Sequence, residues 1–325
     1  MTSTRETPET APDGSVPAIE DNGLPDPERW EQVATREARP DDRPLLLVHG
    51  NCQAESLRVL CQGALGDQVR SVRVPPVFEL TAEQVDTFHA LVARTSFLVT
   101  QPIVDDYRDL PLGTAQIEAL LPGSAHVARV PVLRWSALMP THAIVRAAGV
   151  GDPPGVPYHD LRVLAAAARG EREADLSEPS RSAVREVHRI TREQLAVRQE
   201  HHGTVDALPL FEDAQGEGAW TINHPGNPVL IGVARLALER LGVPAAVTDP
   251  GRVLLATTTA PLAASTLDAL DYAGTPREDW THEGRTHSAA EIAATQLAWY
   301  GEHPQVVEAG LRRHRDTLDV LGLAV

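Results

Sequence analysis

The sequence predicts an α/β fold, in which helices flank a mainly parallel β-sheet and the C-terminal half of the chain is largely helical. Two observations support this prediction. Short apolar runs of strand length alternate with helix-length periodic segments up to about residue 130. Farther along the chain, apolar residues recur mostly at helical spacing. Alternation of strands and helices is typical of parallel sheets, because each crossover between parallel strands usually contains a helix.

Four segments have the pattern of strands: residues 45–48, 69–74, 96–100 and 126–130. Residues 45–48 form an uninterrupted apolar run, as expected of a strand buried on both faces. Residues 69–74 alternate apolar and polar side chains. Because ligands bind at the carboxyl ends of parallel strands, the polar residues that follow these segments are candidates for a site.

Helices are predicted between these strands over residues 54–65, 81–93 and 114–121. Thr81 and Gln84 have the spacing of a capping box, in which each side chain bonds the backbone N–H of the other residue. Later helices are predicted over 160–168, 169–202, 229–241 and 289–321, the last divided at Pro304.

The first 42 residues are acidic and rich in proline, and we expect a flexible leader in which only Trp30 is suited to burial. Residues 43–325 are expected to form a single α/β domain. Helical additions to that domain are expected at about 170–202 and 285–325.

The charge of the chain excludes some classes of partner. The formal net charge is −16, and all 29 residues counted as lysine or arginine are arginine. Proteins that bind nucleic acid or anionic membranes usually carry a basic surface, so neither partner is expected. The absence of lysine also excludes a P-loop lysine and a lysine Schiff base.

Two cysteines are too few for a disulfide framework, so a reducing compartment is expected. The N-terminal residues lack the apolar stretch of a signal peptide. No run approaches the ~18 apolar residues of a membrane span. We therefore predict a cytoplasmic protein without a membrane-spanning segment.

The pentapeptide HGNCQ, residues 49–53, joins the first predicted strand to the first predicted helix. Cys52 is thereby placed at the first turn of a helix, where free N–H groups and the helix dipole favour a thiolate. Asn51 and Gln53 supply amide donors of the kind found in oxyanion holes, and Gly50 permits close backbone approach. The alternative is that Cys52 is a buried thiol that fills a corner of the core; Cys61 is predicted to be such a core residue.

A nucleophilic cysteine needs a base, and His224 is the first candidate. Asn223 beside it is suited to orient the ring, although the same residues are also typical of a helix-capping turn. His159 is the second candidate, and the alternative there is that Asp160 caps a helix and His159 lies in a loop.

Polar residues also follow the third predicted strand. Gln101 would face the same crevice as Cys52, and the guanidinium of Arg108 is suited to pair with a phosphate. The alternative is a turn with a solvated charge cluster. The sequence has no metal-ligand spacing such as HxxxH or CxxC, no GxGxxG or Walker pattern, and no GxSxG elbow.

Together these motifs resemble those of the WcbI-like polysaccharide biosynthesis proteins, a family of acetyltransferases of bacterial capsule synthesis. The resemblance covers roughly residues 44–243 in matching order. Its motifs are GNCQ at 50–53, QPI at 101–103, DYR at 106–108, LGT at 112–114, YHD at 158–160 and NHP at 223–225.

The resemblance implies a protein that binds coenzyme A and transfers an acyl group from this small-molecule donor to the hydroxyl of a sugar-type acceptor. Cys52 would be the catalytic thiol and His224 its partner. The residues expected to stabilise the oxyanion or contact substrate are Asn51, Gln53, Gln101, Asn223 and His159. Those expected at coenzyme A are Gly50, Tyr107 and Arg108, and no metal is expected.

Two other functions fit the same residues. One is a thiol-dependent hydrolase or an acyltransferase of specialised metabolism. The other is a non-catalytic protein that binds coenzyme A or a nucleotide sugar, in which Cys52 is structural. Within the leading interpretation, the acyl group passes either through Cys52 or directly to an acceptor that His224 deprotonates.

Overall fold

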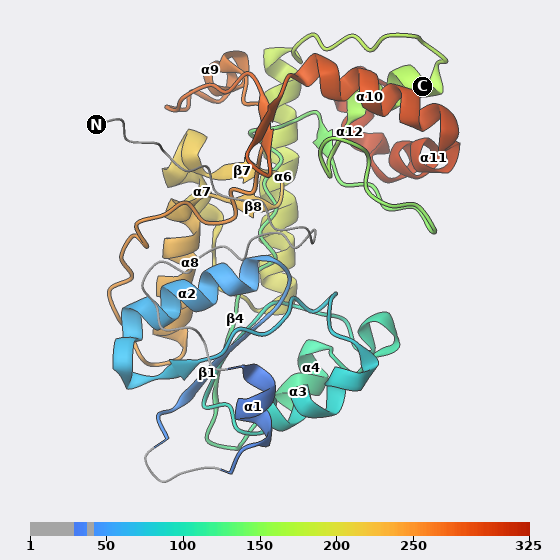
Figure 1. Ribbon diagram of the computed structural model, residues 1–325. Coiled ribbons are helices and arrows are strands. Elements are labelled where there is room, and N and C mark those ends of the chain that lie inside the picture. The colour runs from blue at the N-terminus through green and yellow to red at the C-terminus, as the bar shows by residue number, and fades with distance from the viewer. Residues whose placement is uncertain (1–28, 38–41) are drawn as a thin grey trace, which may run out of the picture.

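The computed structural model describes residues 29–37 and 42–325, and its centre is a four-stranded parallel sheet (Figure 1). The strand order is β2-β1-β3-β4. The strands are β1 (Leu45–His49), β2 (Arg70–Ser71), β3 (Phe97–Thr100) and β4 (His126–Arg129). The predicted α/β class is confirmed, and β1, β3 and β4 lie where the sequence predicts them.

The order of the strands creates a switch point beside β1. The chain leaves β1 for β2 on one side and then returns to β3 on the other side, with His49 of β1 in register with Thr100 of β3. In sheets of this kind the crevice lies at the carboxyl ends of the strands where the order reverses. The segments that follow β1 and β3 therefore border the expected position of a site.

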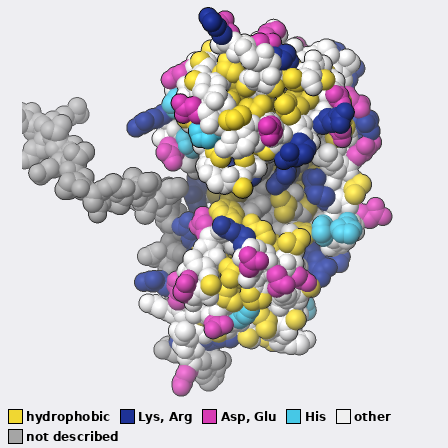
Figure 2. All heavy atoms as spheres, turned by 90° about the vertical axis from the view of Figure 1, so that its right-hand side faces the viewer, with side chains coloured by type: hydrophobic (Ala, Val, Ile, Leu, Met, Phe, Trp, Pro, Cys, Tyr) yellow, Lys and Arg dark blue, Asp and Glu magenta, His cyan; other side chains and the backbone are white. Residues whose placement is uncertain are grey.

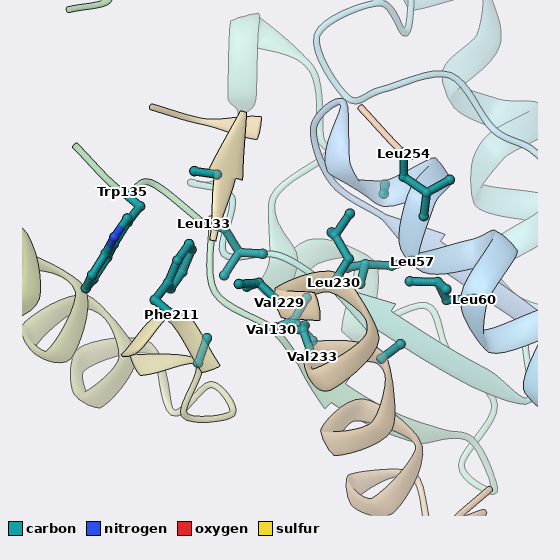
Figure 3. Close-up of a cluster of buried hydrophobic side chains, with 14 of the residues drawn as sticks. Leu57, Leu60, Val130, Leu133, Trp135, Phe211, Val229, Leu230, Val233 and Leu254 are labelled. Atoms are coloured by element: carbon teal, nitrogen blue, oxygen red, sulfur yellow. The ribbon is translucent and has the colours of Figure 1, made fainter. Parts of the chain in front are cut away.

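Helices cover both faces of the sheet. On one face α2 (Gln53–Leu65) packs against α8 (Asn227–Arg240), and on the other α1 (Trp30–Thr35) packs against α3 (Val85–Val92), as Figure 1 shows. Figure 3 shows the core on the first face, where Leu57 of α2 lies near Leu230 of α8. Complete burial of one such leucine contributes about 1.5–3 kcal/mol.

Helix α1 lies inside the segment that was expected to be a flexible leader. Trp30, Val33 and Ala34 are buried in the core on the second face, and the Trp30 ring meets Phe88 edge-on at 6.3 Å. The part of the expected leader that the structure describes is therefore packed on the domain, because its apolar side chains lie on one side of a short helix. Residues 1–28 lie outside the described residues.

The rest of the chain is largely helical, as predicted. Figure 1 places α10, α11 and α12 together, away from the sheet, while the long helix α6 runs between the two regions. The remaining helices are α4 (Thr114–Glu118), α5 (Leu161–Ala168), α6 (Arg181–His202), α7 (Leu208–Ala214), α9 (Ala264–Leu270), α10 (Ala289–Glu302), α11 (Pro304–Arg313) and α12 (Arg315–Val320).

Short antiparallel pairs connect these helices. The pairs are β5 (His142–Ala143) with β6 (His159–Asp160), β7 (Ala219–Thr221) with β8 (His224–Pro225), and a three-stranded sheet of β9 (Thr258–Thr259), β10 (Trp280–His282) and β11 (Arg285–His287).

Three predicted elements differ from the structure. The strand expected at 69–74 pairs only over Arg70–Ser71, because β2 is an edge strand and the chain turns away toward Pro75. The helix expected at 169–202 begins only at Arg181, after a loop. The segment expected to hold two helices holds three, because the backbone leaves the helical region at His314 as well as at His303.

The capping box that the sequence predicts is present. The Gln84 side chain accepts from the Thr81 N–H at 3.1 Å, and the first turn that follows is a 3₁₀-helix over Ala82–Gln84. Within residues 29–37 and 42–325, no helix is both long and apolar enough to cross a membrane. The same residues contain no group of three or more His, Cys, Asp or Glu side chains placed to hold a metal ion.

Candidate active site around Cys52 and His224

The turn between β1 and α2 brings the predicted thiol and the predicted base together. Cys52 is the N-cap residue of α2, and its Sγ lies 3.8 Å from Nε2 of His224. Cys52 is half-buried. The two residues are 172 positions apart in the chain, and the fold therefore assembles the pair that the sequence only suggests.

Gly50 has a steric role at this turn. A Cβ atom on Gly50 would lie 2.5 Å from Oε1 of Gln101, a distance that a real side chain does not tolerate. The close approach lets Oε1 of Gln101 accept from the Asn51 N–H at 2.9 Å. The Gln101 carboxamide thus packs directly on Gly50, and the expected role of Gly50 at coenzyme A stays a prediction.

Gln53 is fully buried and ties three distant segments to the turn. Its Nε2 donates to the carbonyls of Leu133 and Asn223, both at 2.8 Å. Its Oε1 accepts from Gln101 Nε2 at 2.7 Å and from the Leu133 N–H at 3.1 Å. The Nε2 of Gln101 also reaches the Pro131 carbonyl at 3.3 Å.

These bonds correct the role expected of both glutamines. Both amide groups donate to protein acceptors, so neither Gln53 nor Gln101 has a donor left for an oxyanion or a substrate. They hold the ends of β1 and β3 and the segment before His224 at a fixed separation. Both glutamines lie beside the cysteine turn, as the sequence predicts, and their side-chain N–H groups bond other protein segments.

Two other donors remain beside the thiol. Oδ1 of Asn51 accepts from the Gln53 N–H at 2.9 Å, which turns the Asn51 amide toward the start of α2. In the described part of the chain, neither Nδ2 of Asn51 nor the Cys52 N–H has a protein acceptor. Both groups can donate to an oxyanion that forms at this turn.

His224 is held by a hairpin and not by a helix cap. It pairs with Thr221 across the tight turn between β7 and β8, and α8 begins only at Asn227. The Tyr158 ring meets the His224 ring edge-on, with centroids 6.3 Å apart. Its hydroxyl donates to Oδ1 of Asn223 at 2.8 Å and thereby fixes the residue before the base.

The other ring nitrogen of His224 has no strong partner. The Leu255 backbone favours the charged ring slightly, but Nδ1 is buried without a partner at hydrogen-bond geometry among the described residues. No carboxylate in the described chain orients this ring. Burial therefore dominates and lowers the pKa of His224 to about 4.

The same burial acts on the thiol in the opposite direction. It raises the pKa of Cys52 above its ordinary value, and Glu79 adds to the rise, while the residue's own N–H and Arg134 oppose it. The expected thiolate is therefore wrong for this structure, because desolvation outweighs the helix N-terminus. At neutral pH the pair is a thiol facing a neutral imidazole, and an imidazole with a free Nε2 can accept the thiol proton during a reaction.

His159, the second candidate base, is directed elsewhere. It is buried on β6, and its Nδ1 lies 2.6 Å from the hydroxyl of Tyr300 on α10. Burial lowers its pKa to about 4. Successive residues of an extended segment point to opposite sides, so Tyr158 faces His224 while His159 faces away. The alternative expectation for Asp160 is confirmed, since its side chain caps α5 by accepting from the Arg162 N–H at 2.8 Å.

Tyr107 and Arg108 lie after β3, on the other side of the turn. Tyr107 packs on the core that contains α1 and α3. Arg108 donates to the carbonyl of Phe78, and the neighbouring Val77 N–H donates to the Gly50 carbonyl at 2.8 Å. Arg108 is thus near the rim of the turn without contact to Cys52, and its expected role at coenzyme A stays a prediction.

Tyr158 is a site residue that the sequence motifs do not single out. It belongs to the motif at 158–160, where the neighbouring histidine has the more common catalytic side chain. Strand alternation carries the relevant signal. If one of two neighbouring residues faces the site, the other faces the core, and the pattern alone does not say which.

The fold and the site define an α/β protein with a cysteine–histidine pair at the carboxyl edge of a parallel sheet. The sequence profile of the polysaccharide biosynthesis enzyme WcbI matches residues 45–246. The chain belongs to this family of polysaccharide biosynthesis enzymes, and the resemblance inferred from the motifs is confirmed.

A solved structure of WcbI has the same fold, with a TM-score of 0.72 at 17% sequence identity. The alignment covers 87% of this chain and 99% of that chain. That protein is described as a novel polysaccharide biosynthesis enzyme, in a native form without a disulfide bond between coenzyme A and one of its cysteines. No curated protein sequence matches this chain significantly.

Proposed function

We propose that this chain is an acyltransferase that moves an acyl group from coenzyme A to a hydroxyl of a sugar or glycan, with Cys52 and His224 as the reacting pair. The observation that supports it most is the separation of 3.8 Å between Sγ and Nε2 at the N-terminus of α2. Coenzyme A is proposed as the donor because the WcbI structure is described together with this thiol compound and a cysteine.

The reaction begins with a proton transfer. The Cys52 proton passes to Nε2 of His224 while Sγ attacks the carbonyl carbon of the thioester. The Cys52 N–H and Nδ2 of Asn51 stabilise the oxyanion of the tetrahedral intermediate. The intermediate collapses with cleavage of the bond to the coenzyme A sulfur, which takes the proton from His224.

The second half returns the thiol. His224 takes the proton of the acceptor hydroxyl, the hydroxyl oxygen attacks the acyl carbon on Cys52, and the Cys52 sulfur leaves and regains a proton. In the direct route the acceptor attacks the thioester of coenzyme A itself, and His224 performs the same deprotonation. Both routes need a neutral His224, which the lowered pKa of that ring favours. The reducing cytoplasm expected from the sequence would keep Cys52 available as a thiol.

Mass spectrometry of the intact protein with a panel of acyl-CoA compounds tests this function. We expect an added acyl mass on the peptide that contains Cys52 in the wild type and in Cys61→Ala, and none in Cys52→Ala. Transfer to an acceptor without any adduct would replace the covalent route by the direct one. Thioester hydrolysis that needs no acceptor would favour a hydrolase. Coenzyme A binding with an inert thiol would favour a binding protein.

A further inference from the structure

A hollow with a volume of about 550 Å³ is lined by residues of two segments that also border the Cys52–His224 pair. Its walls come from segment 134–144, from helix α6 and from the junction of α11 with α12. Figure 2 views the molecule from the side of α11 and α12 and shows a hollow across its middle, with arginine side chains at its border. The volume is in the range of pockets that bind small molecules and cofactors, which is ~300–1,000 Å³.

Two chain segments connect this hollow to the reacting pair. Arg134 and Ile222 line the hollow, and each is the direct neighbour of a residue whose carbonyl Gln53 holds. The Trp135 N–H donates to the Ile222 carbonyl at 2.8 Å, so the two segments run side by side. The lining of the hollow therefore comes within two residues of His224 along the chain.

The polar lining of the hollow is mainly cationic. Arg134, Arg198 and Arg313 reach it from three different elements, and none of the three has an ion pair or hydrogen bond within the described residues. The lining includes one carboxylate, Asp316. Arg189 also lines the hollow, but its guanidinium is already paired with glutamates of its own helix.

The chain has 45 acidic and 29 basic residues, and many of its arginines are paired with carboxylates. Arginines elsewhere, such as Arg58 and Arg162, contact carboxylates at 2.7–2.8 Å. The charge of Arg134 instead faces the charges of Arg313 and Arg198. Burial and Arg313 lower the pKa of Arg134, and burial and Arg134 lower the pKa of Arg198. The Arg134 side chain nevertheless keeps an exposed surface, because it lies in the wall of a hollow that water still enters.

We propose that this arginine pocket binds the phosphate groups of the substrate whose reactive end reaches Cys52. The three guanidinium groups offer paired donors that match phosphate oxygens, and an anion among them would remove their mutual repulsion. Thr191, Thr317 and Ser136 add hydroxyl donors to the same wall. This inference rests on the proposed function, because the phosphate groups are assigned to a substrate of that reaction. Phosphate binding by the pocket does not itself require catalysis.

A pyrophosphate group occurs in two substrates of the proposed reaction, the coenzyme A donor and a nucleotide-linked sugar acceptor. Calorimetric titration of the full chain with coenzyme A, with a nucleoside diphosphate sugar and with inorganic pyrophosphate separates them. We expect Arg134→Gln, Arg198→Gln and Arg313→Gln each to weaken pyrophosphate binding about tenfold. The matched control is Arg235→Gln, which removes an exposed arginine of α8 that is paired with Glu239 at 2.8 Å.

A similar loss of affinity for coenzyme A in the three variants would assign the pocket to the donor. A loss of affinity for the nucleoside diphosphate sugar alone would assign it to the acceptor. Pyrophosphate affinity that changes less than about twofold in all three variants would overturn the proposal. Acylation of Cys52 by a phosphate-free acyl thioester provides an independent readout, because it reports the reacting pair alone. If this acylation fails while the arginine variants still lose pyrophosphate binding, the proposed function is wrong and the pocket stands.

Discussion

Helix α2 carries both cysteines of the chain, and its first turn and its interior give them opposite surroundings. Cys52 is half-buried at the N-cap, 3.8 Å from an imidazole nitrogen. Cys61 is fully buried on the face that packs in the core, and burial alone raises its pKa to about 12. Burial raises the pKa of both thiols, but Cys61 lacks the opposing effects of its own N–H and of Arg134 that act on Cys52. Cys52 also has a proton acceptor within reach.

Removal of each sulfur in turn tests most directly whether the two cysteines differ in function. In Cys52→Ala we expect the transfer rate to fall more than about a thousandfold, as is usual when a covalent nucleophile is lost. Steady-state turnover with an acyl-CoA and an acceptor measures this. Cys61→Ala is the matched control on the same helix and should keep its rate. Wild-type turnover in Cys52→Ala would eliminate covalent catalysis.

Removal of the proton acceptor should have the next largest effect. His224→Ala is expected to lower the rate about 100- to 10,000-fold, the usual contribution of a general base. The fold should remain, because the side chain makes no hydrogen bond that stabilises the β7–β8 hairpin. His126→Ala, on the exposed surface of β4, serves as the control. A rate equal to that of the wild type would show that another group deprotonates the thiol.

The glutamine contacts predict a mixed effect on stability and activity. Gln101→Ala leaves the Asn51 N–H without its acceptor and loses the bond to Gln53, which should cost about 1–3 kcal/mol of unfolding free energy. The rate should fall as well, since the cysteine turn loses its support. Urea unfolding and turnover measure the two effects. Gln62→Ala removes a half-buried amide of the same helix that bonds only the carbonyls of Gly66 and Val69, so it should cost less stability and leave the rate unchanged.

Cys61→Ala should reveal the structural role of the second thiol. Loss of one buried sulfur atom from the core is expected to cost about 1 kcal/mol, which corresponds to a decrease in Tm of about 2–4 °C. Thermal unfolding followed by circular dichroism measures the shift. No decrease in Tm would mean that the core around α2 closes over the missing atom.

The smallest effect is expected from pH within the neutral range. Because the pKa of His224 is lowered to about 4, the ring is already neutral at pH 6, and the rate should vary little between pH 6 and 8. The rate should fall only as the pH drops toward 4, when the ring takes up a proton and no longer accepts one. A plot of kcat/KM against pH measures this, with stability checked at each pH. A decrease in kcat/KM that sets in near pH 6.5 would instead indicate that His224 has the pKa of an ordinary imidazole.

The free energy of unfolding should also decrease as the pH falls. Folded His49, His142, His159 and His224 each have a pKa lowered to about 4 by burial, so the unfolded chain binds more protons once the pH is below about 6.5. The contribution of these groups to stability is therefore full above about pH 6.5, decreases as the pH falls from about 6.5 to 4, and changes little further below 4. An activity loss that reverses on return to pH 7 separates titration of His224 from unfolding.

Elements with strong local patterns could be predicted from the sequence, and partners far apart in the chain could not. The apolar run at 45–48 and the periodic segment at 54–65 appear as β1 and α2 with bounds shifted by one residue. The break at His314 was missed because nothing in its local composition marks a helix end.

The candidate site shows the same division. Cys52 and His224 could be named because thiol and imidazole chemistry is visible in residue type. The task of Gln53 could not be predicted, since its four bonds reach Gln101, Leu133 and Asn223 only after the chain folds. The direction of the Cys52 pKa was missed for a related reason. Local sequence indicates a helix N-terminus, whereas desolvation comes from segments that pack around it.

The four bonds of Gln53 also have a consequence for how the protein matures. Its carboxamide joins segments that lie about 50, 80 and 170 residues away, so the junction closes only after these long loops have formed. Closure of long loops is entropically costly and slows folding. The thiol–imidazole pair should thus be among the last contacts to appear on refolding. The recovery of acylation at Cys52 would then time the completion of the fold, later than the return of helix signal.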